Sequence, residues 1–291
     1  MPNDIRLSEL KVGAIINTSS GGCDSESEQK IFSILTRAGV VRPRVWCGSA
    51  DEMTRSFREA TEQNLDVLIV FGGDGTIRTA AEGCAEKGSY LIPLPGGTIN
   101  MLSRALYGDV AWEESLENTL TAPSLKVLSG GVAGKQFLIA AIVGAPALLA
   151  EPRESMREGN IVDAIEKGSV AFRKMFETKI QYLVSGGMKG EAEVVALICP
   201  LISEQMSDSE QALEAAAIDV ESATEVIGLV STAAFGKWRD HRNILLTKTK
   251  RVNVQSSNDI PATLDGERVN LGMSAEIDFV PNALTVLVPA K

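Results

Sequence analysis

Residues 65–76 read Leu-Asp-Val-Leu-Ile-Val-Phe-Gly-Gly-Asp-Gly-Thr, an apolar run that ends in a glycine-rich stretch. Residues 65–71 predict a strand, and the unbroken apolar run 67–71 within it indicates a sheet that is covered on both faces, because a half-exposed strand would alternate apolar and polar residues. The glycines favour a tight turn, and residues 76–87 then have the pattern of a helix. This strand-loop-helix unit is typical of a parallel sheet in an α/β protein.

The same unit recurs on both sides of this stretch. Apolar runs predict three further strands, at residues 12–16, 44–47 and 90–94. A helical pattern follows each of them, and Ser49 with Glu52 forms a capping-box pair before the helix that reaches about residue 63. The helix after the last of these strands is predicted to start at Thr98. We therefore expect a doubly wound α/β domain over residues 1–122.

The pattern changes in residues 123–291, where short β-rich runs predominate. Residues 130–135 have the composition of a hairpin connection between two such runs. Residues 151–179 predict a helix. Further strands are predicted at residues 180–184, 193–199, 226–231, 251–255, 275–279 and 284–288. We expect a second, mostly antiparallel, β-sandwich-like domain, and a C-terminal strand near residues 284–289 could return to the first domain.

Charge and composition exclude several classes of protein. The chain of 291 residues has 28 Lys and Arg against 38 Asp and Glu, a net charge of −10, which disfavours a nucleic-acid-binding protein. His241 is the single histidine, so sites that need several histidines cannot be built, and we expect it to lie in a solvated loop. The four widely spaced cysteines fit reduced thiols in a cytoplasmic protein, and neither a signal peptide nor an apolar membrane span is expected.

Three loops follow predicted strands in the first domain. Residues 17–22 and 72–76 are rich in small residues, and residues 93–100 read Pro-Leu-Pro-Gly-Gly-Thr-Ile-Asn. Loops at the carboxyl ends of parallel strands meet at one edge of the sheet, where helix N-termini favour anions and glycines allow a phosphate to approach the backbone. Asp74 could then help to hold Mg²⁺. The alternative is a set of tight turns with Asp74 as a helix cap, and the recurrence of the motif favours a nucleotide site.

These residues resemble the diacylglycerol kinase catalytic domain family, which includes soluble bacterial lipid kinases and the sphingosine and ceramide kinases. The resemblance rests on Gly-Gly-Asp-Gly-Thr at 72–76, on Pro-Gly-Gly-Thr-Ile-Asn at 95–100 and on Leu-Asp-Gly-Glu at 264–267. It implies two domains, with ATP and lipid meeting in the cleft between them, and Mg²⁺-dependent transfer of the ATP γ-phosphoryl group to a lipid hydroxyl of the diacylglycerol type.

The resemblance also assigns roles to individual residues. Asp265, with Glu267 beside it, would accept the proton of the acceptor hydroxyl, and a carboxylate base of this kind needs no histidine. Asp74 would organise phosphate and metal. The residues expected to contact the nucleotide are Asn17, Gly72, Gly73, Asp74, Gly75, Thr76, Gly96, Gly97, Thr98 and Asn100. For Asp265 and Gly266 the structural alternative is a β-turn between two strands.

Three positions depart from the family pattern. The first loop has Asn17-Thr18 where the family often has Asn-Pro. Arg78 and Thr79 stand where the family usually has Asn-Glu, and Met101 stands where an Asp commonly follows the Asn, which removes a carboxylate from the site. Metal binding or acceptor choice could therefore differ from the family pattern.

Two other functions stay open at this stage. One is a kinase for a soluble acceptor, as in NAD kinase, and the other is a catalytically weak nucleotide- or lipid-binding protein of the same fold. For a lipid kinase we expect transient contact at the inner membrane face, because neither domain is basic enough to dock stably on an anionic bilayer. A role in phospholipid biosynthesis and a homodimer are further expectations, and a nucleic-acid partner is not expected.

Overall fold

The computed structural model describes residues 4–24, 26–144, 179–207, 209–219, 239 and 244–289. The chain divides into one unit of Met1–Val127 with Asn282–Lys291 and a second unit of Leu128–Pro281. Three expectations fall outside the described residues: the helix over residues 151–179, of which only Lys179 is described and is not helical, the strand at 226–231, and the loop position of His241.

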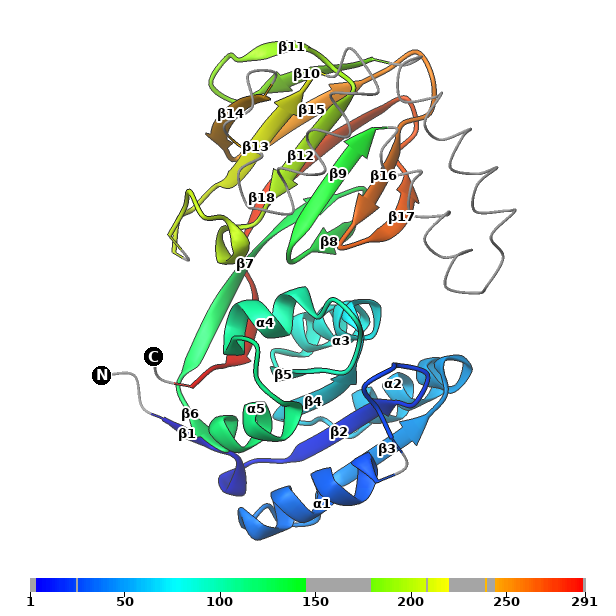
Figure 1. The fold of residues 1–291 in the computed structure, drawn as a ribbon, viewed down its shortest axis with the longest axis vertical. Helices are drawn as coiled ribbons and strands as arrows, with labels where there is room; N and C mark the ends of the chain where they lie inside the picture. The colour runs from blue at the N-terminus through cyan, green and yellow to red at the C-terminus, as the bar shows by residue number, and fades with distance from the viewer. Residues whose placement is uncertain are drawn as a thin grey trace. The chain divides into compact units, whose positions relative to one another are not determined.

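Parallel strands flanked by helices form the first unit (Figure 1). Its strands are β2 (Val12–Asn17), β3 (Arg44–Gly48), β4 (Val67–Gly72) and β5 (Tyr90–Pro95). They lie in the order β3-β2-β4-β5, and every neighbouring pair is parallel. The helices are α1 (Ser27–Arg37), α2 (Met53–Glu62), α3 (Asp74–Lys87), α4 (Met101–Tyr107) and α5 (Trp112–Thr119). The predicted doubly wound sheet is confirmed.

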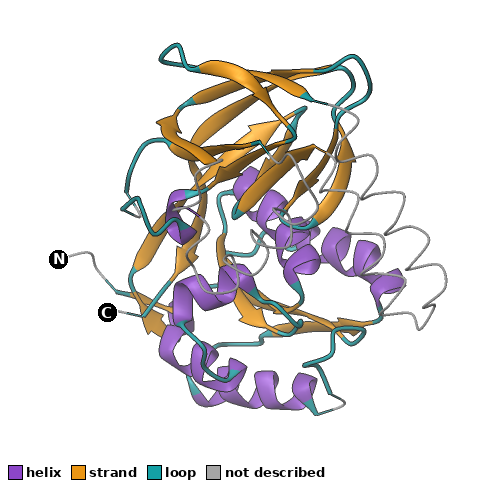
Figure 2. Ribbon diagram, turned by 45° about the horizontal axis from the view of Figure 1, so that its top comes forward, coloured by secondary structure: helices purple, strands orange, loops and turns teal. Residues whose placement is uncertain are grey.

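Helices cover both faces of this sheet, which explains why β4 is buried at every residue. On one face Ile31 and Leu35 of α1 and Leu116 of α5 belong to the same core cluster as Phe71 of β4. On the other face the Nε1 atom of Trp46 in β3 donates a hydrogen bond of 3.1 Å to the carboxylate of Glu59 in α2. Figure 2 shows the helices gathered around the strands of this unit.

The predicted helix starts meet two different outcomes. The capping box of Ser49 and Glu52 is confirmed, with the Ser49 amide donating to the Glu52 carboxylate at 2.8 Å. The predicted start at Thr98 is wrong, because α4 begins at Met101. Asn100 has φ 55° and ψ 45°, a left-handed conformation that cannot continue a right-handed helix. Helix α5 was not expected from the sequence.

Antiparallel strands form the described part of the second unit. One of its sheets joins β10 (Ile180–Val184), β11 (Lys189–Ala192) and β15 (Arg251–Gln255) to β18 (Ser274–Leu287). The other has the order β14-β13-β12-β9-β16-β17. Its strands are β9 (Ala140–Gly144), β12 (Val194–Ile198), β13 (Leu213–Ile218), β14 (Ile244–Thr249), β16 (Pro261–Leu264) and β17 (Glu267–Asn270). Both contribute to one apolar core that includes Val254 and Val195, so the predicted sandwich-like domain is confirmed.

The strands that connect with the first unit are β7 (Ser124–Val132) and β18. Strand β7 forms the predicted hairpin with β8 (Lys135–Phe137), in which Val132 pairs with Lys135. The two strands predicted at 275–279 and 284–288 are one continuous strand, β18. Pro281 interrupts the apolar sequence pattern between them, but its backbone is extended and the strand continues through it. Near its end, Thr285 pairs in parallel with Tyr90 of β5. A short pair of β1 (Ile5–Arg6) and β6 (Thr121–Ala122) completes the fold.

Among the described helices, none is long and apolar enough to cross a membrane. All four cysteines are free thiols. Burial raises the pKa of the Cys84 thiol to about 12, so this group stays protonated and unreactive near neutral pH.

Candidate functional site

The glycine-rich loop after β4 leads directly into α3. Gly73 precedes the first helical residue, Asp74, and its carbonyl accepts the amide hydrogen of Ile77 at 3.0 Å. The first N–H groups of a helix have no acceptor within the helix, so the start of α3 presents donors at the carboxyl end of β4. This is the position at which open α/β sheets bind ligands.

The loop after β5 packs against it backbone to backbone. The amide of Gly96 donates to the carbonyl of Gly72 at 3.0 Å. A Cβ atom on Gly96 would lie 2.8 Å from the amide nitrogen of Gly72, and one on Gly97 would lie 2.7 Å from the Cα atom of Gly73. The glycines are therefore required for contact between the two loops, whatever they also offer to a ligand.

The loop after β2 joins the other two. The side-chain amide of Asn17 donates to the hydroxyl of Thr76 at 2.9 Å. The hydroxyl of Ser20 accepts from the amide of Gly73 at 3.1 Å, and the amide of Gly22 donates to the carbonyl of Gly96 at 2.9 Å. The structure thus brings together all three loops, as the sequence predicted. Sequence reasoning missed Ser20, because one hydroxyl in a run of small residues carries no distinct signal.

Asp74 holds the start of α4. Its two carboxylate oxygens accept the amide hydrogens of Asn100 at 3.1 Å and of Met101 at 2.9 Å. Burial raises the pKa of Asp74 above its usual value, against the opposing effect of these amides. The structural alternative, in which Asp74 caps the helix after β4, is wrong, because Gly73 is the N-cap of α3 and Asp74 is its first residue. The carboxylate instead caps the start of α4, and it is a half-buried anion beside the glycine loops.

Asn100 shapes the loop from inside. Its side-chain oxygen accepts the amide hydrogen of Gly97 at 2.7 Å, and its side-chain nitrogen donates to the carbonyl of Gly97 at 2.7 Å. The residue is buried, with 6% of its surface exposed. Thr98 and Ile99, in contrast, are exposed at the tip of the loop. Asn100 was expected to contact a nucleotide, but in the structure its side chain holds the loop in shape through Gly97.

A Mg²⁺ site made of protein groups alone does not fit the residues present. Among the described residues no group of three or more His, Cys, Asp or Glu side chains could hold a metal ion. Asp74 is the carboxylate in the loop after β4, and its oxygens already accept two amides. Mg²⁺ bound by one carboxylate usually takes its remaining ligands from water and substrate phosphates. An ion here would have to arrive with a nucleotide.

Asp265 lies in the second unit, at the turn between β16 and β17. Asp265 and Gly266 have φ values of 50° and 88°, as in a two-residue hairpin turn. The carboxylate accepts the amide hydrogens of Leu138 at 2.8 Å, Ile139 at 2.9 Å and Ala140 at 3.0 Å. The turn that the structural alternative predicted is present, and three amides fix the orientation of its carboxylate. Glu267, the first residue of β17, is exposed.

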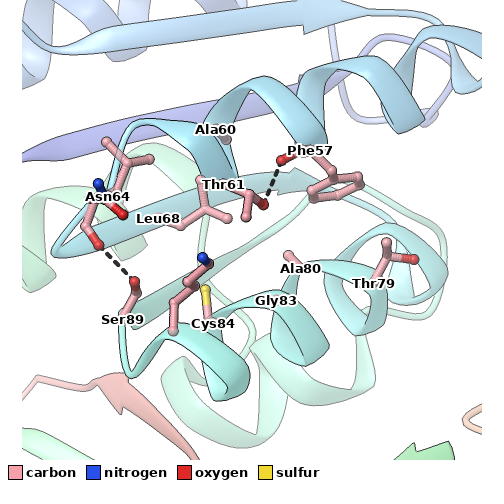
Figure 3. A pocket seen from close by; sticks show the side chains of 12 residues that line it. Phe57, Ala60, Thr61, Asn64, Leu68, Thr79, Ala80, Gly83, Cys84 and Ser89 are labelled. Atoms are coloured by element: carbon pink, nitrogen blue, oxygen red, sulfur yellow. Dashed lines mark hydrogen bonds between the residues drawn. The ribbon is translucent and has the colours of Figure 1, made fainter.

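A small hollow lies between α2 and α3 (Figure 3), away from the loops. Apolar atoms of Phe57, Leu68, Ala80 and Cys84 contribute to its lining, and its volume is about 60 Å³. Ser89, which also lines it, lies just before β5, whereas the loops follow the carboxyl ends of the strands. A space of this size holds only a few water molecules and cannot hold a nucleotide.

The backbone contact between the glycine loops makes a stability prediction. Gly97→Ala should lower the free energy of unfolding by about 1–3 kcal/mol, because its Cβ would overlap the backbone of Gly73. Gly83→Ala in α3 is the matched control, since nothing lies within 4 Å of its new Cβ and alanine favours a helix by about 1 kcal/mol. Urea unfolding of both variants checks this. A Gly97→Ala protein as stable as Gly83→Ala would contradict the loop packing.

Comparison with known proteins finds relatives that cover most of the chain. The pattern of the diacylglycerol kinase catalytic domain matches residues 11–130, a span that contains all three loops. The diacylglycerol kinase of Staphylococcus aureus (strain Newman) is 26% identical over 271 residues, covering 85% of this chain and 85% of that protein.

Solved structures share the fold. One from Bacillus anthracis str. Sterne, assigned as a diacylglycerol kinase, has a TM-score of 0.74 at 20% identity and covers 96% of this chain and 95% of that one. Another from the same organism has a TM-score of 0.71 at 21% identity, covering 96% and 97%. At these identities the likeness shows the fold, an α/β domain followed by a β-rich domain, and confirms the fold class that the sequence predicted.

Proposed function

We propose that this chain, whose residues 11–130 match the diacylglycerol kinase catalytic domain, transfers the γ-phosphoryl group of ATP to a lipid hydroxyl. The observation that carries the proposal is the junction of three strand-end loops around the start of α3. Such a junction offers backbone donors and little side-chain bulk to a polyphosphate. The proposed acceptor is a diacylglycerol-like lipid.

In this proposal the ATP phosphates lie against residues 72–76 and 96–98, with Asn17 and Asn100 holding the loops in shape. Phosphoryl transfer depends on positioning and charge neutralisation, and loops packed backbone to backbone are rigid enough for the first task. Mg²⁺ would enter as the ATP complex, with Asp74 as the protein carboxylate beside it, and would supply neutralisation of phosphate charge. Asp74 would meanwhile keep the start of α4 in place through its two amides.

We propose that the carboxylate of Asp265 accepts the proton that leaves the hydroxyl of the lipid acceptor. A general base must be held in a fixed direction, and the amides of Leu138, Ile139 and Ala140 hold this carboxylate. An ionised carboxylate has about four acceptor positions, so these three bonds alone do not prevent it from taking a proton. Glu267 would support the same step from the start of β17.

Two exposed apolar side chains favour a lipid over a soluble acceptor. Ile99 has 55% and Met101 has 40% of its surface exposed, on either side of the buried Asn100. They lie at the loop where the phosphates are proposed to bind, and they would contact acyl chains more favourably than water. With a net charge of −10, membrane contact should be brief and local, at the inner face of the membrane.

The acceptor class can be tested with the purified full chain and γ-labelled ATP. We expect label to enter the organic phase when total lipid extract in mixed micelles is the acceptor. With NAD as the acceptor we expect no labelled product. Labelled NAD without labelled lipid would instead favour a soluble acceptor, and ATP binding without any transfer would favour a binding protein that has lost catalysis.

A further inference from the structure

Arg78 is a mostly buried cation one helical turn beyond Asp74 in α3. Only 13% of its side chain is exposed. One of its partners is Glu82, whose carboxylate lies 3.7 Å from the Nη1 atom of Arg78 and is half exposed. An ion pair of this length with a solvated partner is weak, and it can be exchanged for a better acceptor.

The helical repeat determines the face of α3 on which Arg78 lies. Residues four apart share one side of a helix, so Asp74, Arg78 and Glu82 form one row. Thr79, Gly83 and Lys87 form another row, which lines the hollow toward α2. The row with Arg78 is the one on which Asp74 reaches the amides that begin α4. In the structure the Nη1 atom of Arg78 lies beside Glu82, one turn further from the glycine loops. Once it leaves Glu82, the long Arg78 side chain can follow the N-terminal tilt of helical side chains and reach over the first turn to these loops.

The three loops contain acidic residues and no basic ones, so a bound phosphate would need a cation from elsewhere. Residues 17–24, 72–76 and 96–100 contain no Lys or Arg, but they include Asp24 and Asp74. Lys30 pairs with Asp24 at 3.6 Å, but the three loops contain no Lys or Arg of their own, so a polyphosphate would add its negative charge to that of Asp74. A guanidinium pairs with phosphate through two parallel hydrogen bonds, which an ammonium cannot reproduce.

We propose that Arg78 is a phosphate-binding residue of this site, leaving Glu82 to pair with the outer phosphates of the nucleotide. This inference rests on the proposed ATP-dependent function and adds to it the group that neutralises phosphate charge from the protein side.

The experiment is calorimetric titration of the full chain with ATP, ADP and adenosine. Arg78→Gln should weaken ATP binding roughly tenfold or more, as expected for a lost charge-assisted hydrogen bond. It should weaken ADP binding less and leave adenosine binding unchanged. Arg78→Lys should recover part of the ATP affinity. The matched control is Arg104→Gln in α4, which removes an arginine paired with Asp109 at 3.2 Å and should change none of the three affinities.

The outcomes separate this inference from the proposed function. Unchanged ATP affinity in Arg78→Gln, with label transfer to lipid intact in the wild type, overturns the role of Arg78 alone. An equal loss for ATP, ADP and adenosine also overturns it, because a phosphate contact must depend on the number of phosphates. Absence of nucleotide binding in the wild type overturns both. Thermal unfolding of each variant shows that the titrated protein is folded.

Discussion

Asp265→Asn is expected to reduce label transfer from ATP to lipid by about 10²- to 10⁴-fold, the range for loss of a general base. Asparagine suits the test because it tolerates the φ of 50° at this turn and forms the same hairpin with Gly266. Its carbonyl oxygen can still accept the amides of Ile139 and Ala140, as Oδ1 of Asp265 does. The turn should therefore survive while the proton acceptor is lost.

Side effects of this substitution are measurable. The side-chain amide would face the N–H of Leu138, which now donates to Oδ2, so the free energy of unfolding should fall by about 1–3 kcal/mol. Glu267→Gln, two residues away on an exposed position, should reduce transfer much less. Initial rates at saturating ATP check both variants. If folded Asp265→Asn transferred phosphate to lipid at the full rate, the carboxylate would serve only to hold the backbone of residues 138–140 in place.

Asp74→Asn is expected to reduce transfer by a similar factor, because it removes a carboxylate that lies in the glycine loop after β4 and bonds the start of α4. The side-chain carbonyl of asparagine can still accept one of the amides of Asn100 and Met101, but its NH2 group places a donor opposite the other, where a carboxylate oxygen now accepts. The start of α4 should loosen, and transfer should not recover when Mg²⁺ is raised. Steady-state rates over a Mg²⁺ series provide the measurement.

Asp66→Asn is the matched control for this variant. Asp66 also accepts a backbone amide, from Lys11 at 2.8 Å, but it precedes β4 and lies away from the loops. It should lose comparable stability and keep its activity. Equal activity losses in the two variants would reduce the role of Asp74 to that of a helix cap.

The pH dependence of stability gives a second check on Asp74. Burial raises its pKa in the folded protein above the value in the unfolded chain. The folded state therefore binds more protons between these two values, and stability falls as pH rises through that window. The excess stability of the wild type over Asp74→Asn should thus shrink as pH rises above the ordinary pKa of an aspartate. Urea unfolding at several pH values measures this, and an excess that grows would contradict the burial.

The sequence predicts the first unit well because its signals are local. The apolar run at 65–71 and the glycines after it specify both the strand and the helix that follows, and the structure differs there by only a residue or two. Asn100 shows where this reasoning fails. A residue with φ of 55° is invisible in a helical pattern, so the start of α4 was predicted three residues early.

The site could be predicted only in part for a similar reason. Residue types revealed the three loops, but the acceptors and donors that join them are mostly backbone atoms, such as the Gly72 carbonyl and the Gly96 amide. Every residue carries these groups, so no sequence pattern marks the few that are used. The amides of Leu138, Ile139 and Ala140 around Asp265 are a second example.

The central claim is phosphoryl transfer from ATP to a lipid hydroxyl. Its most direct test is incubation of the full chain with γ-labelled ATP and purified diacylglycerol in mixed micelles, followed by separation of organic and aqueous phases. We predict labelled, singly phosphorylated diacylglycerol in the organic phase, in amounts that match the ADP formed. ADP formation with all label left in the aqueous phase, or no ADP at all, would contradict the account.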